Sequence, residues 1–332
     1  MTYNYELGAS MVHDGHLHLI LLPTERCNFR CTYCYEDFAI GHMKREVVQG
    51  VKAFLDRRVS KLTSLRIGWF GGEPLLAKRA VLEISRHAAS LKERFPELRY
   101  QAEMTTNAYL LTPELLGQLS EAGVQQYQIS LDGPRDIHDR TRRRIDGRGT
   151  FDRIWRNLLH IKSSKLPVQV QIRIHYDSHK AKHMEPLLDD IREQLLVDER
   201  FDAFFKELEA LGGPNDDRLI QLGPAEEKRL LPRLRARLFT EQRLIEKSKQ
   251  QAAPMVCYAA KANSLLVRAD GRLGKCTVAF NDERNTVGRL LRNGRLDIDQ
   301  DRWWYWLRGL TDLNPDIIAC PWHEHDQEAS PA

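Results

Sequence analysis

Three of the six cysteines in the chain lie within eight consecutive residues, in the sequence CNFRCTYC. Cys27, Cys31 and Cys34 are separated by three and then two residues. Closely spaced thiolates bind zinc or iron–sulfur clusters, and a structural zinc site usually has four ligands. The nearest further cysteine is Cys257, so a zinc site made of cysteines alone would need a distant fourth ligand. A loop of three cysteines fits a 4Fe–4S cluster whose fourth iron is left open for a small molecule.

The CNFRCTYC segment resembles the CxxxCxxC signature of the radical S-adenosylmethionine (SAM) superfamily, and the longer LPTERCNFRCTYCYE resembles its peptide-modifying members. The resemblance implies that the open iron binds the amino and carboxylate groups of SAM. It also implies that an electron from the cluster cleaves SAM to methionine and a 5′-deoxyadenosyl radical, which abstracts a hydrogen from the substrate. A zinc-binding interaction module is the non-enzymatic alternative.

The sequence GGEP follows a stretch that we expect to be a strand. Gly71 and Gly72 would let the backbone approach a ligand closely, and Glu73 could accept a hydrogen bond from an ammonium group. A Gly-Gly pair before Glu-Pro is also an ordinary turn signal. By resemblance to the superfamily, Gly71, Gly72, Glu73 and Pro74 would hold the amino group of the methionine part of SAM.

Asn107 and Ser130 lie at the ends of two further expected strands, where short polar side chains can reach a ribose or a carboxylate. Ordinary strand capping explains the same positions. The resemblance implies polar contacts with SAM at these strand ends. It also assigns Tyr33, between the second and third cysteines, to a position that shields the cluster and approaches the adenine.

The segment HDRTRRRIDGRGTF, residues 138–151, is strongly basic. A solvated loop would have the same composition. The segment also resembles the part of related maturases in which one arginine contacts the SAM carboxylate, and Arg142 matches that arginine best, with Arg143 next. Bidentate pairing of a guanidinium with a carboxylate makes such a contact chemically favourable.

The other three cysteines, Cys257, Cys276 and Cys320, lie in the last quarter of the chain. The spacing from Cys257 through Gly271 to Cys276 resembles the opening of the SPASM/twitch auxiliary-cluster domain, which binds additional 4Fe–4S clusters. Only Cys320 follows, so the resemblance implies one auxiliary cluster, with an open iron or with His323 as the fourth ligand. The alternatives are buried core thiols and an exposed tail histidine.

Short β-rich runs alternate with amphipathic helical stretches over residues 1–250. The expected strands are 18–23, 65–70, 100–106, 124–131, 168–176 and 201–208. The expected helices are 44–60, 78–94, 113–122, 150–163, 181–198 and 224–247. This alternation predicts an α/β fold with a parallel sheet, a partial (β/α)6 TIM-type barrel. Active sites of such barrels lie at the carboxyl ends of the strands, which is where the cysteine loop, GGEP, TTNA and SLDG occur.

Residues 251–332 are expected to form a small C-terminal iron–sulfur domain of the auxiliary type, with a hairpin that turns at Asp270 and Gly271. A segment this short and loop-rich would depend on a metal cluster for stability. The N-terminal sequence through HLHLILL, residues 1–22, is interpreted as a strand rather than as a signal peptide, because no basic segment precedes its apolar run.

The composition is that of an ordinary soluble globular protein, with 42% hydrophobic and 29% charged residues. The formal net charge of +4 is too small to indicate nucleic-acid binding, and no apolar run is long enough to span a membrane. Without a signal peptide the chain is expected in the cytoplasm, where clustered cysteines are metal ligands or redox groups more often than disulfides.

If all six cysteines ligate clusters, no free thiol remains to quench a substrate radical with a hydrogen atom. We therefore predict a net oxidation, most simply an oxidative crosslink in a ribosomally synthesised precursor peptide. A flavodoxin- or ferredoxin-type protein would supply the electron. Because only a short segment precedes the cysteine loop, leader recognition is expected from the barrel, the tail or a separate leader-binding protein.

Two other enzymatic hypotheses share these motifs. One is a dehydrogenase of the sulfatase-maturing type that oxidises a Cys or Ser on a protein. The other is a radical SAM enzyme that acts on a small molecule, for which the basic stretches would suit a phosphorylated substrate. No catalytic acid or base can be assigned, although Glu207 and Glu209 end the sixth expected strand and could face the site.

Overall fold

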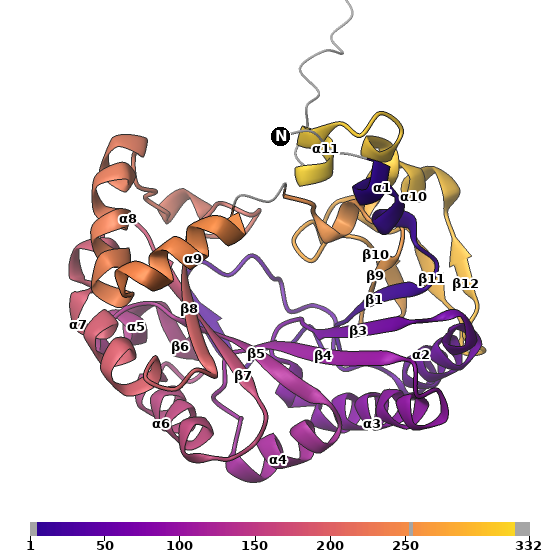
Figure 1. Ribbon diagram of the computed structural model, residues 1–332, viewed down its shortest axis with the longest axis horizontal. Helices are drawn as coiled ribbons and strands as arrows, with labels where there is room; N and C mark the ends of the chain where they lie inside the picture. Colours follow the sequence, from indigo (N-terminus) through magenta and orange to yellow (C-terminus); the bar gives the residue numbers. More distant parts are fainter. Residues whose placement is uncertain (1–4, 252–254, 323–332) are drawn as a thin grey trace, which may run out of the picture.

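The computed structural model describes residues 5–251 and 255–322. Its centre is a mostly parallel sheet, in agreement with the expected α/β fold (Figure 1). Six neighbouring strands are paired in parallel, in the order β1, β3, β4, β5, β7 and β8. They are His16–Leu21, Ser64–Trp69, Arg99–Thr106, Val124–Leu131, Gln169–Tyr176 and Phe201–Glu207. Within the described residues β1 and β8 are not paired with each other, so this part of the sheet is open.

Helices between these strands cover the convex outer side of the sheet (Figure 1). They are α2 (Arg45–Arg58), α3 (Lys78–Arg94), α4 (Pro113–Glu121), α5 (Arg135–Thr141), α6 (Phe151–Ser163) and α7 (Glu185–Asp190). Helix α4 illustrates why they begin where they do, because the side chain of Thr112 caps its first turn and a proline occupies its first position. Its apolar positions recur at helical spacing, so Leu115 and Leu119 are buried against the sheet.

Two expected helices are interrupted. The stretch expected as 181–198 is divided into a 3-10 turn, α7 and a π-helical segment at Ile191–Leu195. The single helix expected at 224–247 is two helices, α8 (Pro224–Leu238) and α9 (Glu241–Gln251). The break occurs because Phe239 is buried in an extended conformation, and Thr240 then accepts a hydrogen bond from the backbone of Arg243 and so caps α9.

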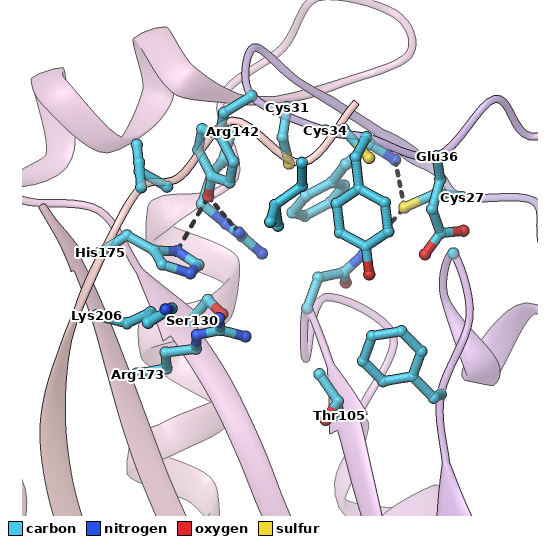
Figure 2. A pocket seen from close by; sticks show the side chains of 18 of the residues that line it. Cys27, Cys31, Cys34, Glu36, Thr105, Ser130, Arg142, Arg173, His175 and Lys206 are labelled. Atoms are coloured by element: carbon cyan, nitrogen blue, oxygen red, sulfur yellow. Dashed lines mark hydrogen bonds between the residues drawn. The ribbon is translucent and has the colours of Figure 1, made fainter. Parts of the chain in front are cut away.

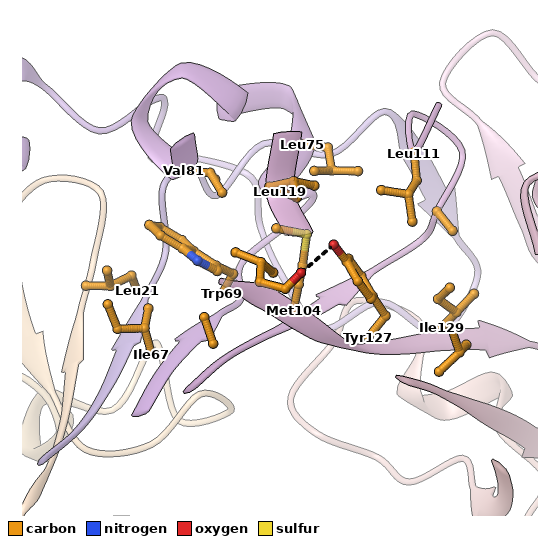
Figure 3. Close-up of a cluster of buried hydrophobic side chains, with 14 of the residues drawn as sticks. Leu21, Ile67, Trp69, Leu75, Val81, Met104, Leu111, Leu119, Tyr127 and Ile129 are labelled. Carbon is orange, nitrogen blue, oxygen red and sulfur yellow. Dashed lines mark hydrogen bonds between the residues drawn. The ribbon is translucent and has the colours of Figure 1, made fainter. Parts of the chain in front are cut away.

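The two faces of the parallel sheet differ in polarity because side chains alternate along each strand. Ile67 and Trp69 of β3 point outward and pack under the helices (Figure 3), and Leu65 of the same strand is buried in the same cluster. Arg66 points to the other side, where it lines a hollow together with polar residues of the neighbouring strands, including Glu103, Gln128 and Gln171. The apolar core thus lies between sheet and helices, and the concave face carries polar groups.

The C-terminal segment extends the same sheet. Strand β9 (Ser264–Val267) pairs in parallel with β1, and the antiparallel strands β10, β11 and β12 follow in order. These are Arg272–Gly274, Gly288–Leu290 and Leu296–Ile298. The expected hairpin is present, with Gly271 at φ 87° between β9 and β10.

Three short helices pack on this C-terminal part of the sheet: α1 (Tyr5–Val12), α10 (Gln300–Leu307) and α11 (Pro315–Ala319). Helix α1 was not expected, since the N-terminal stretch was interpreted only as a strand. Its Met11 is fully buried against Ala260 and Ile318, so both ends of the described chain meet here (Figure 1). No helix among the described residues is long and apolar enough to cross a bilayer.

Candidate active site

A pocket lies at the carboxyl ends of the parallel strands (Figure 2). All four polar or glycine-rich strand ends singled out in the sequence contribute to it. The predicted site residues that line it are Cys27, Cys31, Tyr33, Cys34, Gly71, Gly72, Asn107, Ser130 and Arg142. Residues that we did not predict, including Arg173, His175 and Lys206, line the same pocket from β7 and β8.

The cysteine loop is held in place by the basic segment. Phe29–Cys31 form strand β2 and Arg142–Arg144 form strand β6, and the two pair antiparallel with Cys31 directly opposite Arg142. Two further backbone hydrogen bonds extend this contact, from Thr32 N to Thr141 O at 2.9 Å and from Ile145 N to Asn28 O at 3.0 Å. The basic segment therefore holds the cysteine loop in position through backbone hydrogen bonds, in addition to supplying positive charge.

The three thiols of the loop are partly buried, and burial raises the pKa of each, to about 12 for Cys34. They become strong ligands only when a cation replaces the proton. Cys27 already accepts a hydrogen bond from the backbone N–H of Phe29 at 3.3 Å. Among the residues that the structure describes, no three Cys, His, Asp or Glu side chains converge closely enough to share one metal ion.

A buried network of charges adjoins the loop. Asp132 is fully buried and receives hydrogen bonds from Tyr33 at 2.9 Å and from Lys180 at 3.3 Å, and its carboxylate lies 3.2 Å from Nδ1 of His175. Although burial opposes it, the charge of Lys180 together with the contact to His175 holds the pKa of Asp132 well below its ordinary value. Arg142 in turn donates to the hydroxyl of Tyr33 at 2.7 Å.

Arg142 still has capacity to bind a ligand. Its Nε is buried and has no hydrogen-bond partner among the described residues, while its guanidinium lies 5.9 Å from the ring centre of Phe29. The network around Asp132 therefore orients the arginine without using all of its donors.

The glycines of GGEP are required by close contacts of the backbone. Gly71 has φ 109°, and a Cβ there would lie 2.3 Å from the carbonyl oxygen of Thr24. A Cβ on Gly72 would lie 2.4 Å from the carbonyl oxygen of Arg26. The backbone of Gly72 therefore lies in close contact with the backbone of the segment that leads into Cys27. Both glycines also line the pocket, where they expose backbone.

Glu73 and Pro74 do not line the pocket. Glu73 is fully buried, and its carboxylate accepts hydrogen bonds from Thr106 Oγ1 at 2.7 Å and from the backbone of Asn107 at 2.7 Å and of Leu75 at 3.0 Å. Pro74 begins a short 3-10 turn over Pro74–Ala77. The glutamate thus fixes the end of β4 relative to the Gly-Gly turn, and its side chain is fully used inside the protein.

Asn107 and Ser130 both face the pocket. Asn107 donates to the side chain of Asn28 at 2.9 Å and accepts from the backbone of Tyr109 at 3.0 Å, so it joins the end of β4 to the cysteine loop. Ser130 lies on β5 directly opposite Arg173 of β7 in the parallel register. The expected strand-end positions are thus confirmed for both residues, and Asn107 also has the capping role that was the alternative.

The C-terminal cysteines come from three distant segments. Burial, together with the charges of Cys276 and Cys320, raises the pKa of Cys257 to about 11. Asn285 fixes the Cys276 loop by accepting from the backbone N–H of Cys276 at 2.9 Å. His323, the predicted fourth ligand, lies outside the described residues.

Tyr35 connects the two cysteine-bearing regions. It follows Cys34 immediately, lines the pocket, and donates its hydroxyl hydrogen to the backbone oxygen of Thr277 at 2.9 Å. Thr277 follows Cys276, so one side chain spans from the end of the first cysteine loop to the second.

Residues 21–191, about half of the chain, match the family model of the Radical SAM superfamily. The chain belongs to the radical SAM superfamily. Its members use a 4Fe–4S cluster and SAM, and the residues present fit these groups. Three thiols surround one end of a pocket, a glycine-rich turn exposes backbone beside them, and a buried arginine retains an unused donor.

The chain resembles curated radical SAM enzymes of differing activity. It is 30% identical over 224 residues to a GTP 3′,8-cyclase of Gloeobacter violaceus, covering 64% of this chain and 62% of that protein. It is 27% identical over 117 residues to a PqqA peptide cyclase of Bradyrhizobium diazoefficiens, covering 35% of this chain and 29% of that protein. Most such matches span about a third to a half of the relative's own length.

Solved structures extend the likeness in fold over most of the chain. The structure of anSMEcpe with bound AdoMet and Kp18Cys peptide covers 88% of this chain and 84% of its own, with a TM-score of 0.65 and 19% identity. Streptococcus suis SuiB bound to precursor peptide SuiA covers 90% of this chain and 67% of its own, with a TM-score of 0.59 and 14% identity. At these identities the likeness concerns the fold alone.

Proposed function

We propose that this radical SAM enzyme abstracts a hydrogen from a peptide side chain, and that it forms an oxidative crosslink in a ribosomally synthesised peptide. One observation carries the proposal: the fold shared with two peptide-bound structures covers 88% and 90% of this chain, and so extends beyond the 21–191 core. The PqqA peptide cyclase among the relatives supports the same class of substrate.

In this proposal Cys27, Cys31 and Cys34 hold the 4Fe–4S cluster. When bound, the cluster and SAM together supply the radical that removes the substrate hydrogen. The backbone of Gly71 and Gly72 would hold the amino group of the methionine part of SAM. Arg142 would bind its carboxylate with the donor that the Tyr33 contact leaves free.

The remaining predicted SAM residues act at two levels. Asn107 and Ser130 would contact SAM directly from the ends of β4 and β5, since both face the pocket. Glu73 and Pro74 would act indirectly, without touching SAM, because the carboxylate of Glu73 accepts a hydrogen bond from the backbone of Asn107 and so positions that residue. Tyr33 would shield the cluster while its hydroxyl fixes the orientation of Arg142.

We further propose that Cys257, Cys276 and Cys320 hold one auxiliary 4Fe–4S cluster, with His323 or an open iron completing it. Residues 251–332 would then be the auxiliary domain, built onto the edge of a partial barrel formed by residues 1–250. With every cysteine used as a ligand, no thiol remains to return a hydrogen atom, which supports a net oxidation. The cluster would accept the second electron of that oxidation, and a flavodoxin- or ferredoxin-type protein would supply the first electron to SAM.

The proposal is tested with anaerobically reconstituted full-length protein. Two clusters require about eight irons per chain. With reductant and SAM the protein should form 5′-deoxyadenosine, and a candidate precursor peptide should lose two hydrogens in mass. A peptide of unchanged mass with an inverted α-carbon would contradict the net oxidation. Zinc in place of iron, without cleavage of SAM, would contradict the enzyme itself.

A small-molecule reaction is the second candidate, because the relatives with the higher identities are named GTP 3′,8-cyclase. Incubation with GTP and other nucleotides under the same conditions distinguishes the two. A dehydrogenase of the sulfatase-maturing type would also remove two hydrogens, but from a Cys or Ser of a protein and without forming a new bond between residues.

A further inference from the structure

Arg173 is an unpaired cation in the pocket wall. It lies on β7, beside Ser130 of β5 in the register of the sheet, and lines the pocket that also contains the cysteine loop (Figure 2). Its Nε is buried without a hydrogen-bond partner, and its guanidinium forms no ion pair with any residue that the structure describes. Burial lowers its pKa, which means that the charged form is poorly solvated there.

The other cations of the pocket are already paired. Arg142 donates to Tyr33 and lies 3.9 Å from the carboxylate of Asp132, and Lys206 forms an ion pair with Glu209. A half-buried charge without a partner is incompletely solvated, so its presence in a binding pocket indicates a ligand that compensates for it. Arg173 is therefore the group in this wall that most needs an anion.

The local charge balance indicates how much negative charge the ligand brings. Glu207 and Glu209 line the same end of the pocket as Lys206. Glu209 neutralises Lys206, and Glu207 accepts a hydrogen bond from the backbone of Leu222 at 2.8 Å. Arg173 and Lys206 therefore balance the charges of the two carboxylates, and this wall is close to neutral, although Arg173 itself has no direct partner among the described residues. A site of this kind suits one carboxylate held by direct hydrogen bonds, whereas the negative charge of a triphosphate would be repelled by the two glutamates.

We propose that Arg173 binds the carboxylate of an Asp or Glu side chain of the peptide substrate, in the part of the pocket formed by β5, β7 and β8. The planar guanidinium can hold a carboxylate through two parallel hydrogen bonds, which fixes direction as well as position. Ser130 lies beside it and can donate a further hydrogen bond. This inference rests on the proposed peptide substrate and adds that the peptide is acidic at the residue that enters the pocket.

The test uses full-length protein with its cluster in the oxidised state and with SAM bound. Binding of the blocked tripeptides acetyl-Gly-X-Gly-amide, with X as Glu, Asp, Gln or Asn, is measured by saturation-transfer NMR. The wild type should prefer the acidic peptides over their amides. Arg173→Gln should weaken binding of the acidic peptides by about tenfold and remove the preference, and Arg173→Lys should restore part of it.

Arg66→Gln is the matched control, because Arg66 lies on the same concave side of the sheet but outside this pocket and is paired with Glu103. Its peptide binding should match that of the wild type. Equal binding of acidic and amide peptides by the wild type would overturn the carboxylate assignment, while deoxyadenosine formation and peptide mass would still test the proposed function independently.

Two other results would reassign Arg173. A tenfold loss of SAM affinity in Arg173→Gln, measured by equilibrium dialysis, would place the arginine at the SAM carboxylate and overturn the proposal. Binding of inorganic triphosphate that competes with the acidic peptides and depends on Arg173 would overturn it in favour of a phosphorylated small molecule.

Discussion

Arg142 lies directly opposite Cys31 in the short antiparallel pair of strands β2 and β6. The residue proposed to bind the SAM carboxylate is thus fixed in register with one of the proposed cluster ligands. The pairing joins segments that are more than a hundred residues apart in the sequence. Any shift of one segment therefore moves the other, so backbone hydrogen bonds rather than flexible side chains set the position of Arg142 relative to Cys31.

Tyr33→Phe should weaken SAM binding by about tenfold or more without preventing cluster assembly. The substitution removes the hydroxyl that accepts from Arg142 at 2.7 Å and donates to Asp132 at 2.9 Å. Loss of such charge-assisted hydrogen bonds costs about 1.5–3 kcal/mol. The dissociation constant of SAM is measured by equilibrium dialysis, and iron content is measured on the same sample.

Tyr109→Phe is the control for this change. Tyr109 accepts a hydrogen bond from Arg144 at 3.1 Å, so it contacts the same strand β6 without forming a hydrogen bond to Arg142. SAM affinity should remain at the wild-type value. Equal losses in the two variants would mean that the effect comes from loosening of β6 in general and not from the orientation of Arg142.

Substitutions of the six cysteines should fall into two classes, according to which of the two proposed clusters each one removes. Cys31→Ala should lower the iron content from about eight to about four atoms and abolish 5′-deoxyadenosine formation. Cys276→Ala should lower iron by the same amount but leave SAM cleavage measurable. If Cys276→Ala kept all of its iron, the auxiliary cluster would be excluded, and the C-terminal thiols would become candidates for hydrogen donation to a substrate radical.

Gly72→Ala should disrupt the pocket although it adds only one methyl group. The new Cβ would lie 2.4 Å from the carbonyl oxygen of Arg26, next to Cys27. Because that contact is with backbone, the loop must move, and we expect lower SAM affinity and a lower melting temperature. Gly117→Ala is the control, since nothing lies within 4 Å of its Cβ position in helix α4. It should raise stability by up to about 1 kcal/mol.

Much of this architecture could be predicted from sequence because its signals are local. The six parallel strands and most helices follow from alternating or helical spacing of apolar residues, and the cysteine loop follows from spacing within eight residues. The partly wrong predictions had weak local signals. Neither glycine nor proline marks the break at Phe239, and α1 immediately precedes a strand of similar apolar character.

The features that the sequence did not reveal depend on contacts between distant segments. The three-residue strands β2 and β6 carry no recognisable periodicity, and nothing near Ser264 indicates that β9 joins β1. Asp132 lies in the SLDG sequence that marked a strand end, but only the fold brings it to His175 and Lys180. Arg173 is an inward residue of an ordinary strand, and alternation alone does not separate a binding group from a solvated one.

Arg268→Met should destabilise the protein by about 3–5 kcal/mol. Arg268 and Glu25 form a buried bidentate ion pair, at 3.0 and 2.5 Å, between the C-terminal hairpin and the start of the cysteine loop. Removal of the arginine leaves a buried carboxylate without its cation. Urea unfolding of reconstituted protein measures the change. Arg272→Met, which breaks a more exposed pair with Asp270, should cost no more than about 1 kcal/mol.

His138 predicts a loss of stability at mildly acidic pH. Burial, helped by the charges of Arg142 and Lys180 and opposed by those of Asp132 and Asp139, lowers its pKa to about 3. Between pH 3 and pH 6.5 the unfolded chain therefore binds the proton that the folded protein excludes. The penalty is small at pH 7 and grows as the pH falls through 6.5, by about 1.2 kcal/mol between pH 7 and pH 5.5.

The experiment compares urea unfolding of wild type and His138→Gln over that range. Glutamine can still accept from the backbone of Asp132 and donate to Thr150, as the neutral imidazole does at 3.3 and 3.1 Å, but it does not titrate. The variant should lose less stability on acidification. The difference between the two proteins is used because Glu36, whose pKa burial raises to about 8, contributes in the opposite direction in both. Parallel pH curves would show that His138 can be protonated in the folded protein, and that the network around Asp132 opens more readily than its burial implies.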